Sequence, residues 1–97
     1  MKTRDEVFQI LANQKSSLLA TYQITKIGVF GSYARGKQTE TSDLDILVDY
    51  QKPPTLLKLV EMRDYLSDLL AIKVDVVTVN GLKPRIRDRV FSEVIYL

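Results

Sequence analysis

The segment that decides the fold begins Gly31-Ser32-Tyr33-Ala34-Arg35-Gly36 and ends Asp43-Leu44-Asp45. It joins two short runs, residues 24–30 and 44–48, whose apolar and β-branched content predicts strands. Residues 33–35 suit a short helical turn, and the polar residues 36–42 suit a loop. The segment therefore predicts a strand, a tight turn, a loop and a second strand.

The turn after the first predicted strand has the properties of a phosphate site. Gly31 lets the backbone approach a phosphate closely, and Ser32 can cap the turn and offer its hydroxyl to a phosphate oxygen. The free N–H groups of such a turn attract anions. No Gly-Lys-Ser/Thr follows, so this is not the Walker pattern. Taken alone, a Gly-Ser after a strand is equally an ordinary turn.

Three aspartates are candidate metal ligands. Asp43 and Asp45 flank Leu44 at the start of a strand, so their side chains share one face about 6.6 Å apart along it. Asp75 lies in a third predicted strand, residues 73–79, on the face opposite its apolar neighbours. If these strands are neighbours, about 4.8 Å apart, Asp75 stands beside the pair. That register is an assumption that the sequence does not fix.

Three carboxylates this close repel one another. One pair at about 4 Å costs roughly 4 kcal/mol at an effective dielectric constant of 20, a large part of a small domain's stability of about 5–15 kcal/mol. Either protons or a cation must offset that cost, and a divalent ion held by oxygen ligands is the natural solution. The alternative is that Asp43 and Asp45 are turn residues and Asp75 a solvated charge.

The rest of the chain supplies helices around these strands. Thr3 and Glu6 have the spacing of a capping box at the start of a helix over 3–19. Further elements are a helix over 56–70, a turn at 80–81, a short helix over 84–91 and a closing strand or extended tail over 93–97. This order predicts an α/β (α+β) fold: one domain, residues 1–97, with a small mixed sheet and helices packed on one face.

Composition excludes several chemistries. The 97 residues include no histidine and no cysteine, which rules out Ser-His-Asp and Cys-His nucleophiles and nearly all zinc sites. Any metal must take oxygen ligands, which indicates magnesium, manganese or calcium. The net charge of +2 is too small to demand a nucleic-acid partner. The sequence has no membrane span and no signal peptide, so a cytoplasmic protein is expected.

The joint pattern resembles a known superfamily. Gly31-Ser32, ten residues, Asp43-Leu44-Asp45 and the later triplet Val74-Asp75-Val76 are similar to the nucleotidyltransferase superfamily that includes DNA polymerase β. The run GSYARGKQTETSDLDILVDY resembles the minimal nucleotidyltransferase (MNT) family of bacteria and archaea, and the resemblance covers nearly the whole chain. It departs at Ala71-Ile72, where a glycine ending the helix is expected.

The resemblance implies roles for individual residues. The acids matching Asp43 and Asp45 bind the magnesium that carries ATP, and the acid matching Asp75 completes the metal site and favours deprotonation of the acceptor hydroxyl. The residues matching Gly31 and Ser32 hold the triphosphate. Arg35 and Ser42 are further candidate nucleotide-binding residues. For Arg35, contact with phosphate and an ion pair with a nearby acid are equally consistent with the sequence.

The resemblance also implies a partner. Small members of the family pair as antitoxins with a HEPN-family toxin, forming a hetero-oligomer, and some transfer AMP to a tyrosine of it. The expected function is thus an antitoxin protein adenylyltransferase. Two alternatives remain: an antitoxin that acts by complex formation with little catalysis, and a transferase acting on small molecules such as antibiotics. A basic segment, Lys83, Arg85, Arg87 and Arg89, is either a solvated helix face or a contact with the triphosphate or an acidic partner.

Overall fold

A four-stranded mixed sheet organises the computed structural model, which describes residues 2–97. The order across the sheet is β3 (Val74–Thr78), β2 (Leu44–Asp49), β1 (Lys26–Phe30) and β4 (Ile95–Tyr96). β1 is antiparallel to both β2 and β4, whereas β2 and β3 are parallel. The mixed sheet predicted from the sequence is confirmed, and β3 forms one of its edges.

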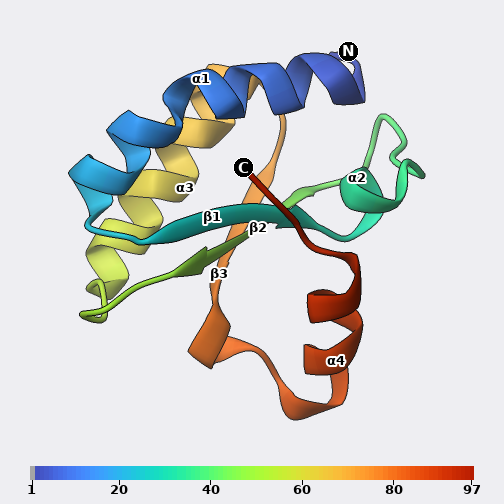
Figure 1. Cartoon of the computed structure of the whole chain (residues 1–97). Helices are drawn as coiled ribbons and strands as arrows, with labels where there is room; N and C mark the ends of the chain where they lie inside the picture. Colours follow the sequence, from blue (N-terminus) through green and yellow to red (C-terminus); the bar gives the residue numbers. More distant parts are fainter. Residues whose placement is uncertain (1) are drawn as a thin grey trace.

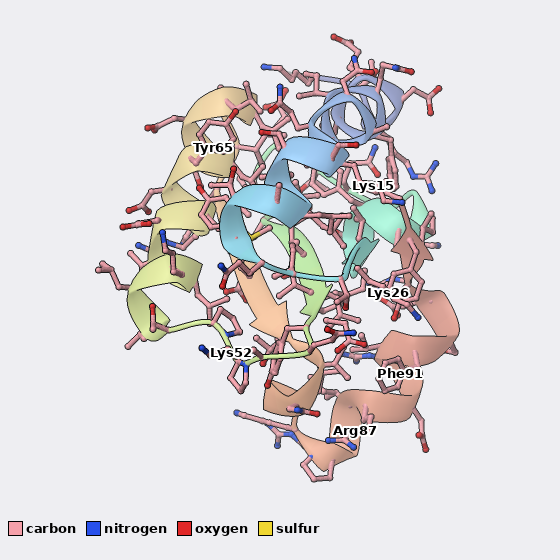
Figure 2. The ribbon with its side chains drawn as sticks, turned by 60° about the vertical axis from the view of Figure 1, so that its left-hand side comes forward. Lys15, Lys26, Lys52, Tyr65, Arg87 and Phe91 are labelled. Atoms are coloured by element: carbon pink, nitrogen blue, oxygen red, sulfur yellow. The ribbon has the colours of Figure 1, made fainter. Side chains whose placement is uncertain are left out.

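Two long helices cover one face of this sheet. Figure 1 shows α1 (Arg4–Tyr22) and α3 (Leu56–Leu70) lying side by side there. The predicted capping box is present, since the Thr3 side chain accepts the Glu6 N–H and Glu6 accepts the Thr3 N–H. Tyr65 lies on α3 (Figure 2), and its Oη donates to Gln14 Oε1 of α1 at 3.0 Å, which ties the two helices together. Between the helices and the sheet lies the larger hydrophobic core.

The opposite face of the sheet has a smaller core of its own. The short helix α4 (Pro84–Glu93) packs there, after the 3-10 turn η1 (Val79–Gly81). This second cluster consists of Phe30, Leu47, Leu82 and Val90. Helix packing on one face is therefore confirmed for α1 and α3, whereas α4 departs from it. The reason is that side chains alternate between the two faces of a strand. Phe30 and Leu47 point away from the large core, so a second element must pack on the other face to bury them.

Two helix ends show where the backbone departs from ordinary geometry. Ala71 ends α3 in the left-handed region, with φ 55° and ψ 37°, at the place where the sequence lacks the expected glycine. Gln23 ends α1 in the same way, with φ 56°. Across residues 2–97, no helix combines the length and apolar character needed to cross a membrane.

Candidate active site

Two of the three predicted acids meet across the parallel pair of strands. Asp45 of β2 and Asp75 of β3 occupy paired register positions, so the neighbouring strands assumed from the sequence are present. Asp43 lies two residues before Asp45, just ahead of β2. Asp43 and Asp75 are exposed, whereas Asp45 is half-buried. The acids therefore lie on the sheet face that α1 and α3 leave open, beside α4.

Asp45 is the acid of this cluster whose pKa is clearly raised. Burial raises the pKa of its carboxyl to about 6, helped by the negative charges of Asp75, Asp43 and Glu93 and opposed by Arg35. Within residues 2–97, no three acidic side chains converge into a ready metal-binding group. The carboxylates nevertheless suit magnesium, because they are the hard oxygen donors that this ion prefers.

Gly31 places the predicted phosphate turn directly against Asp45. Its backbone, φ 75° and ψ −153°, lies in a region that is essentially restricted to glycine. A Cβ at this position would collide with Asp45 Oδ2. Gly31 is also the cap of the short helix α2 (Ser32–Arg35), which has no side-chain capping bond. The expectation that Ser32 caps this turn is therefore wrong: Ser32 is the first residue of α2.

A glutamate from the C-terminal end of α4 reaches this turn. Glu93 Oε2 accepts the Gly31 N–H, and Arg35 Nη1 donates to Glu93 Oε1 and Oε2 at 3.1 and 3.0 Å. Only 13% of the Glu93 side chain is exposed. Of the two readings of Arg35, the structure places it in an ion pair with an acid, inside the region predicted to hold phosphate.

Two adjoining hollows surround the acids. The first, of about 390 Å³, contains the predicted nucleotide-binding residues Gly31, Ser32, Arg35 and Ser42 together with Asp43, Asp45 and Glu93. The second, of about 380 Å³, contains Asp45 and Asp75. Phe30, Asp45 and Arg89 line both hollows. Each volume is within the range of about 300–1,000 Å³ usual for small-molecule sites.

Basic residues complete the second hollow. Lys83, Arg85 and Arg89 line it, whereas Arg87 does not and lies exposed on the outer side of α4 (Figure 2). The basic segment found in the sequence is therefore split between the site and the solvent. Glu93 is the site residue that sequence reasoning missed. A signal existed: Arg89 and Glu93 are four residues apart on a helix, so they share one face.

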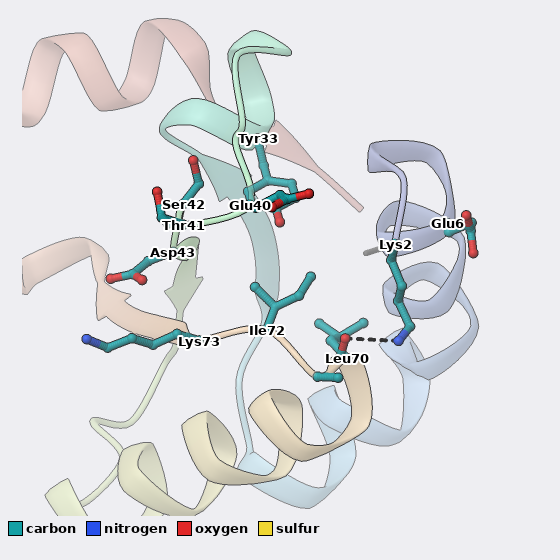
Figure 3. A pocket seen from close by; sticks show the side chains of 11 residues that line it. Lys2, Glu6, Tyr33, Glu40, Thr41, Ser42, Asp43, Leu70, Ile72 and Lys73 are labelled. Carbon is teal, nitrogen blue, oxygen red and sulfur yellow. Dashed lines mark hydrogen bonds between the residues drawn. The ribbon is translucent and has the colours of Figure 1, made fainter.

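A larger hollow, of about 840 Å³, lies at the end of the sheet (Figure 3). It shares Thr41, Ser42 and Asp43 with the first hollow. Lys2 Nζ donates to the Leu70 carbonyl at 3.0 Å at its far side. It contains neither Asp45 nor Asp75, so we place the candidate active site in the two smaller hollows, where the acids meet.

Comparison with known proteins gives consistent matches. A family model described as a nucleotidyltransferase domain matches residues 11–97. A provisionally named protein adenylyltransferase of Methanocaldococcus jannaschii is 49% identical over 98 residues, covering all of both chains. Protein adenylyltransferase MntA of Thermococcus cleftensis is 44% identical over 97 residues, covering all of this chain and 98% of the relative.

Solved structures agree in fold. The structure of a candidate minimal nucleotidyltransferase has a TM-score of 0.77 at 39% identity, covering 94% of this chain and 95% of the other. A toxin–antitoxin crystal structure with AMP-PNP has a TM-score of 0.74 at 26% identity, covering 87% and 69%. The family match spans every predicted site residue, from Gly31 to Asp75. This chain therefore belongs to the nucleotidyltransferase domain family, as a minimal nucleotidyltransferase.

Proposed function

We propose that this protein transfers AMP from ATP, with magnesium, to a hydroxyl of a partner HEPN toxin, with tyrosine as the acceptor, and thereby neutralises that toxin. The observation that carries the proposal is the Asp45–Asp75 pair beside the Gly31 turn. Support comes from the relative named protein adenylyltransferase MntA and from the similar toxin–antitoxin structure with AMP-PNP.

The first hollow suits the triphosphate. Gly31 and Ser32 would present backbone N–H groups and a hydroxyl to it, and Arg35 a guanidinium that pairs well with phosphate oxygens. Ser42 also lines this hollow, and its Oγ accepts the Thr39 N–H at 2.8 Å, which helps to hold the side chain in place. The α-phosphate would then lie beside Asp43 and Asp45.

Asp43, Asp45 and Asp75 would hold the magnesium. When bound, the ion supplies neutralisation of phosphate charge and orients the reacting oxygens. The raised pKa of Asp45 fits this role, because a carboxylate that is costly to ionise alone gains most from a nearby cation.

The reaction is an in-line displacement. The acceptor oxygen forms a bond to the α-phosphorus, the bond from that phosphorus to the bridging oxygen breaks, and pyrophosphate leaves with the electron pair. Asp75, on the edge strand β3, faces solvent and favours loss of the acceptor proton. An edge position also leaves room for the acceptor of a separate protein to approach. Catalysis on this scheme is mostly positioning and charge stabilisation.

The test is to incubate the protein with ATP, magnesium and a HEPN-family toxin, and to weigh the toxin by mass spectrometry. A gain of one or more AMP masses is expected, and it should be lost in Asp43→Asn and Asp45→Asn. Asp49→Asn is the matched control, since Asp49 lies at the far end of the same strand. Mutants that neutralise the toxin fully, with no mass gain in any sample, would mean that complex formation is the mechanism.

A further inference from the structure

The part-buried contact between Glu93 and the Gly31 turn is not explained by the reaction. Glu93 is the last residue of α4, 62 residues after Gly31, yet its carboxylate reaches the Gly31 N–H and the Arg35 guanidinium. Its side chain is 13% exposed, whereas that of Arg35 is 45% exposed. A carboxylate this enclosed needs hydrogen-bond partners, and both partners belong to the proposed triphosphate site.

We propose that Glu93 competes with the nucleotide's triphosphate for Gly31 and Arg35, so that nucleotide binding must displace its carboxylate. This inference rests on the proposed function, because it assumes that the triphosphate occupies the first hollow. It goes beyond that function by naming Glu93 as a residue that lowers nucleotide affinity through its contact with the triphosphate site.

The hydrogen-bond inventory supports competition. The single N–H of Gly31 is directed at Glu93 Oε2, and a phosphate oxygen cannot take the same position. Arg35 directs one nitrogen, Nη1, at both carboxylate oxygens. A triphosphate can bind these donors only if it replaces the Glu93 carboxylate.

Charge supports the same conclusion. Glu93 lines the first hollow together with Asp43 and Asp45, so a triphosphate there would add negative charge next to three carboxylates. Like charges at such short range repel strongly in a partly desolvated site. Withdrawing Glu93 removes one of them and frees Arg35 to pair with phosphate.

The position of Glu93 allows it to move. Helix α4 ends at this residue, with the Val94 N–H donating to the Val90 carbonyl, and the two-residue strand β4 follows. A change in the rotamer of the Glu93 side chain would move its carboxylate away from Gly31 without moving the backbone of the helix. Withdrawal therefore leaves the core contacts of Val90 in place.

The decisive experiment compares wild type with Glu93→Gln. The glutamine carbonyl can still accept the Gly31 N–H, so the fold is retained while the charge is lost. Binding of ATP and of inorganic tripolyphosphate, each with magnesium, is measured by calorimetry. Both should bind about three- to tenfold more tightly to Glu93→Gln, the change expected from removing one partly exposed ion pair. AMP should bind equally to both proteins, because it lacks the phosphates that reach this turn.

Asp88→Asn is the matched control, since it removes one negative charge from the exposed side of the same helix and should leave all three affinities unchanged. Glu93→Asp, which keeps the charge but shortens its reach, should give a smaller gain and serves if the glutamine variant unfolds. Unchanged or weaker ATP binding in folded Glu93 variants would overturn the proposal, and so would equal tightening for AMP or in Asp88→Asn.

The outcomes separate this proposal from the proposed function. Wild type that binds ATP and modifies the toxin, with no tightening in Glu93→Gln, would remove only the role of Glu93. Failure of both wild type and Glu93→Gln to bind ATP would contradict both proposals, since the variant should then have an open site.

Discussion

Asp45 Oδ2 occupies the space in which a side chain on Gly31 would begin. Because of this contact, the phosphate turn and the acid cluster are joined without any residue between them. The backbone of Gly31, at φ 75° and ψ −153°, also requires glycine, whether or not Asp45 is present. Two separate physical causes therefore require glycine at this position.

Gly31→Ala should destabilise the protein by about 2–3 kcal/mol and abolish AMP transfer, because the Cβ pushes Asp45 away and strains the backbone. Urea unfolding measures the first effect and toxin mass the second. Gly36→Ala is the control: Gly36 also has a positive φ, 70°, but nothing lies within 4 Å of its added Cβ. It should cost only about 1–2 kcal/mol. Equal losses in both variants would show that the Asp45 contact is unimportant.

Stability should depend on pH through Asp45. Its pKa is about 6 in the folded protein against an ordinary value of 3.8, so the folded state binds this proton more tightly than the unfolded state does. The contribution of Asp45 is therefore most favourable below about pH 4 and is lost as the pH rises through 6.

Asp45→Asn, measured without magnesium, should thus gain stability over wild type as the pH rises from 4 to 7. Thermal melts of both proteins across this range give the difference. A difference that shrinks with rising pH would mean that the sign of the Asp45 shift is wrong. Added magnesium should reduce the difference, because the ion favours the ionised carboxylate.

The two halves of the basic segment should behave differently. Arg89 lines both hollows, whereas Arg87 lines neither. Arg89→Gln should weaken binding of magnesium ATP by about three- to tenfold, and more at low salt, where charge interactions are less screened. Arg87→Gln removes the same charge from the exposed side of α4 and should change affinity little. Calorimetry at two salt concentrations checks both; equal effects would indicate only a general charge contribution.

Ala71→Gly should stabilise the protein by about 1 kcal/mol, because Ala71 holds a left-handed conformation, φ 55°, that glycine adopts without strain. Ala12→Gly, at an exposed position inside α1, should instead destabilise it by about 1 kcal/mol. Chemical unfolding of both variants measures the opposite signs. A loss of stability in Ala71→Gly would show that flexibility gained by the unfolded chain outweighs the relief of strain.

Much of the fold was predictable because it depends on local patterns. The helix over 56–70 has the bounds of α3, and the Thr3–Glu6 capping box starts α1 as expected. Alternation along the strands placed Asp45 and Asp75 on one face, and the register pairs them. Bounds elsewhere shifted by a few residues, as when α1 continued to Tyr22, because helix ends depend on packing as well as on propensity.

The sequence by itself limited the kind of site, because it offers a glycine at the turn, three aspartates as candidate oxygen ligands and no histidine or cysteine. Only the tertiary structure decided what surrounds it. It placed α4 on the second face of the sheet, brought Arg89 to both hollows and directed Glu93 at the Gly31 turn. Spacing along the chain fixes which face a residue takes within its own element, because backbone geometry is periodic. Contacts between residues 62 positions apart depend on how whole elements pack, and local periodicity does not encode that.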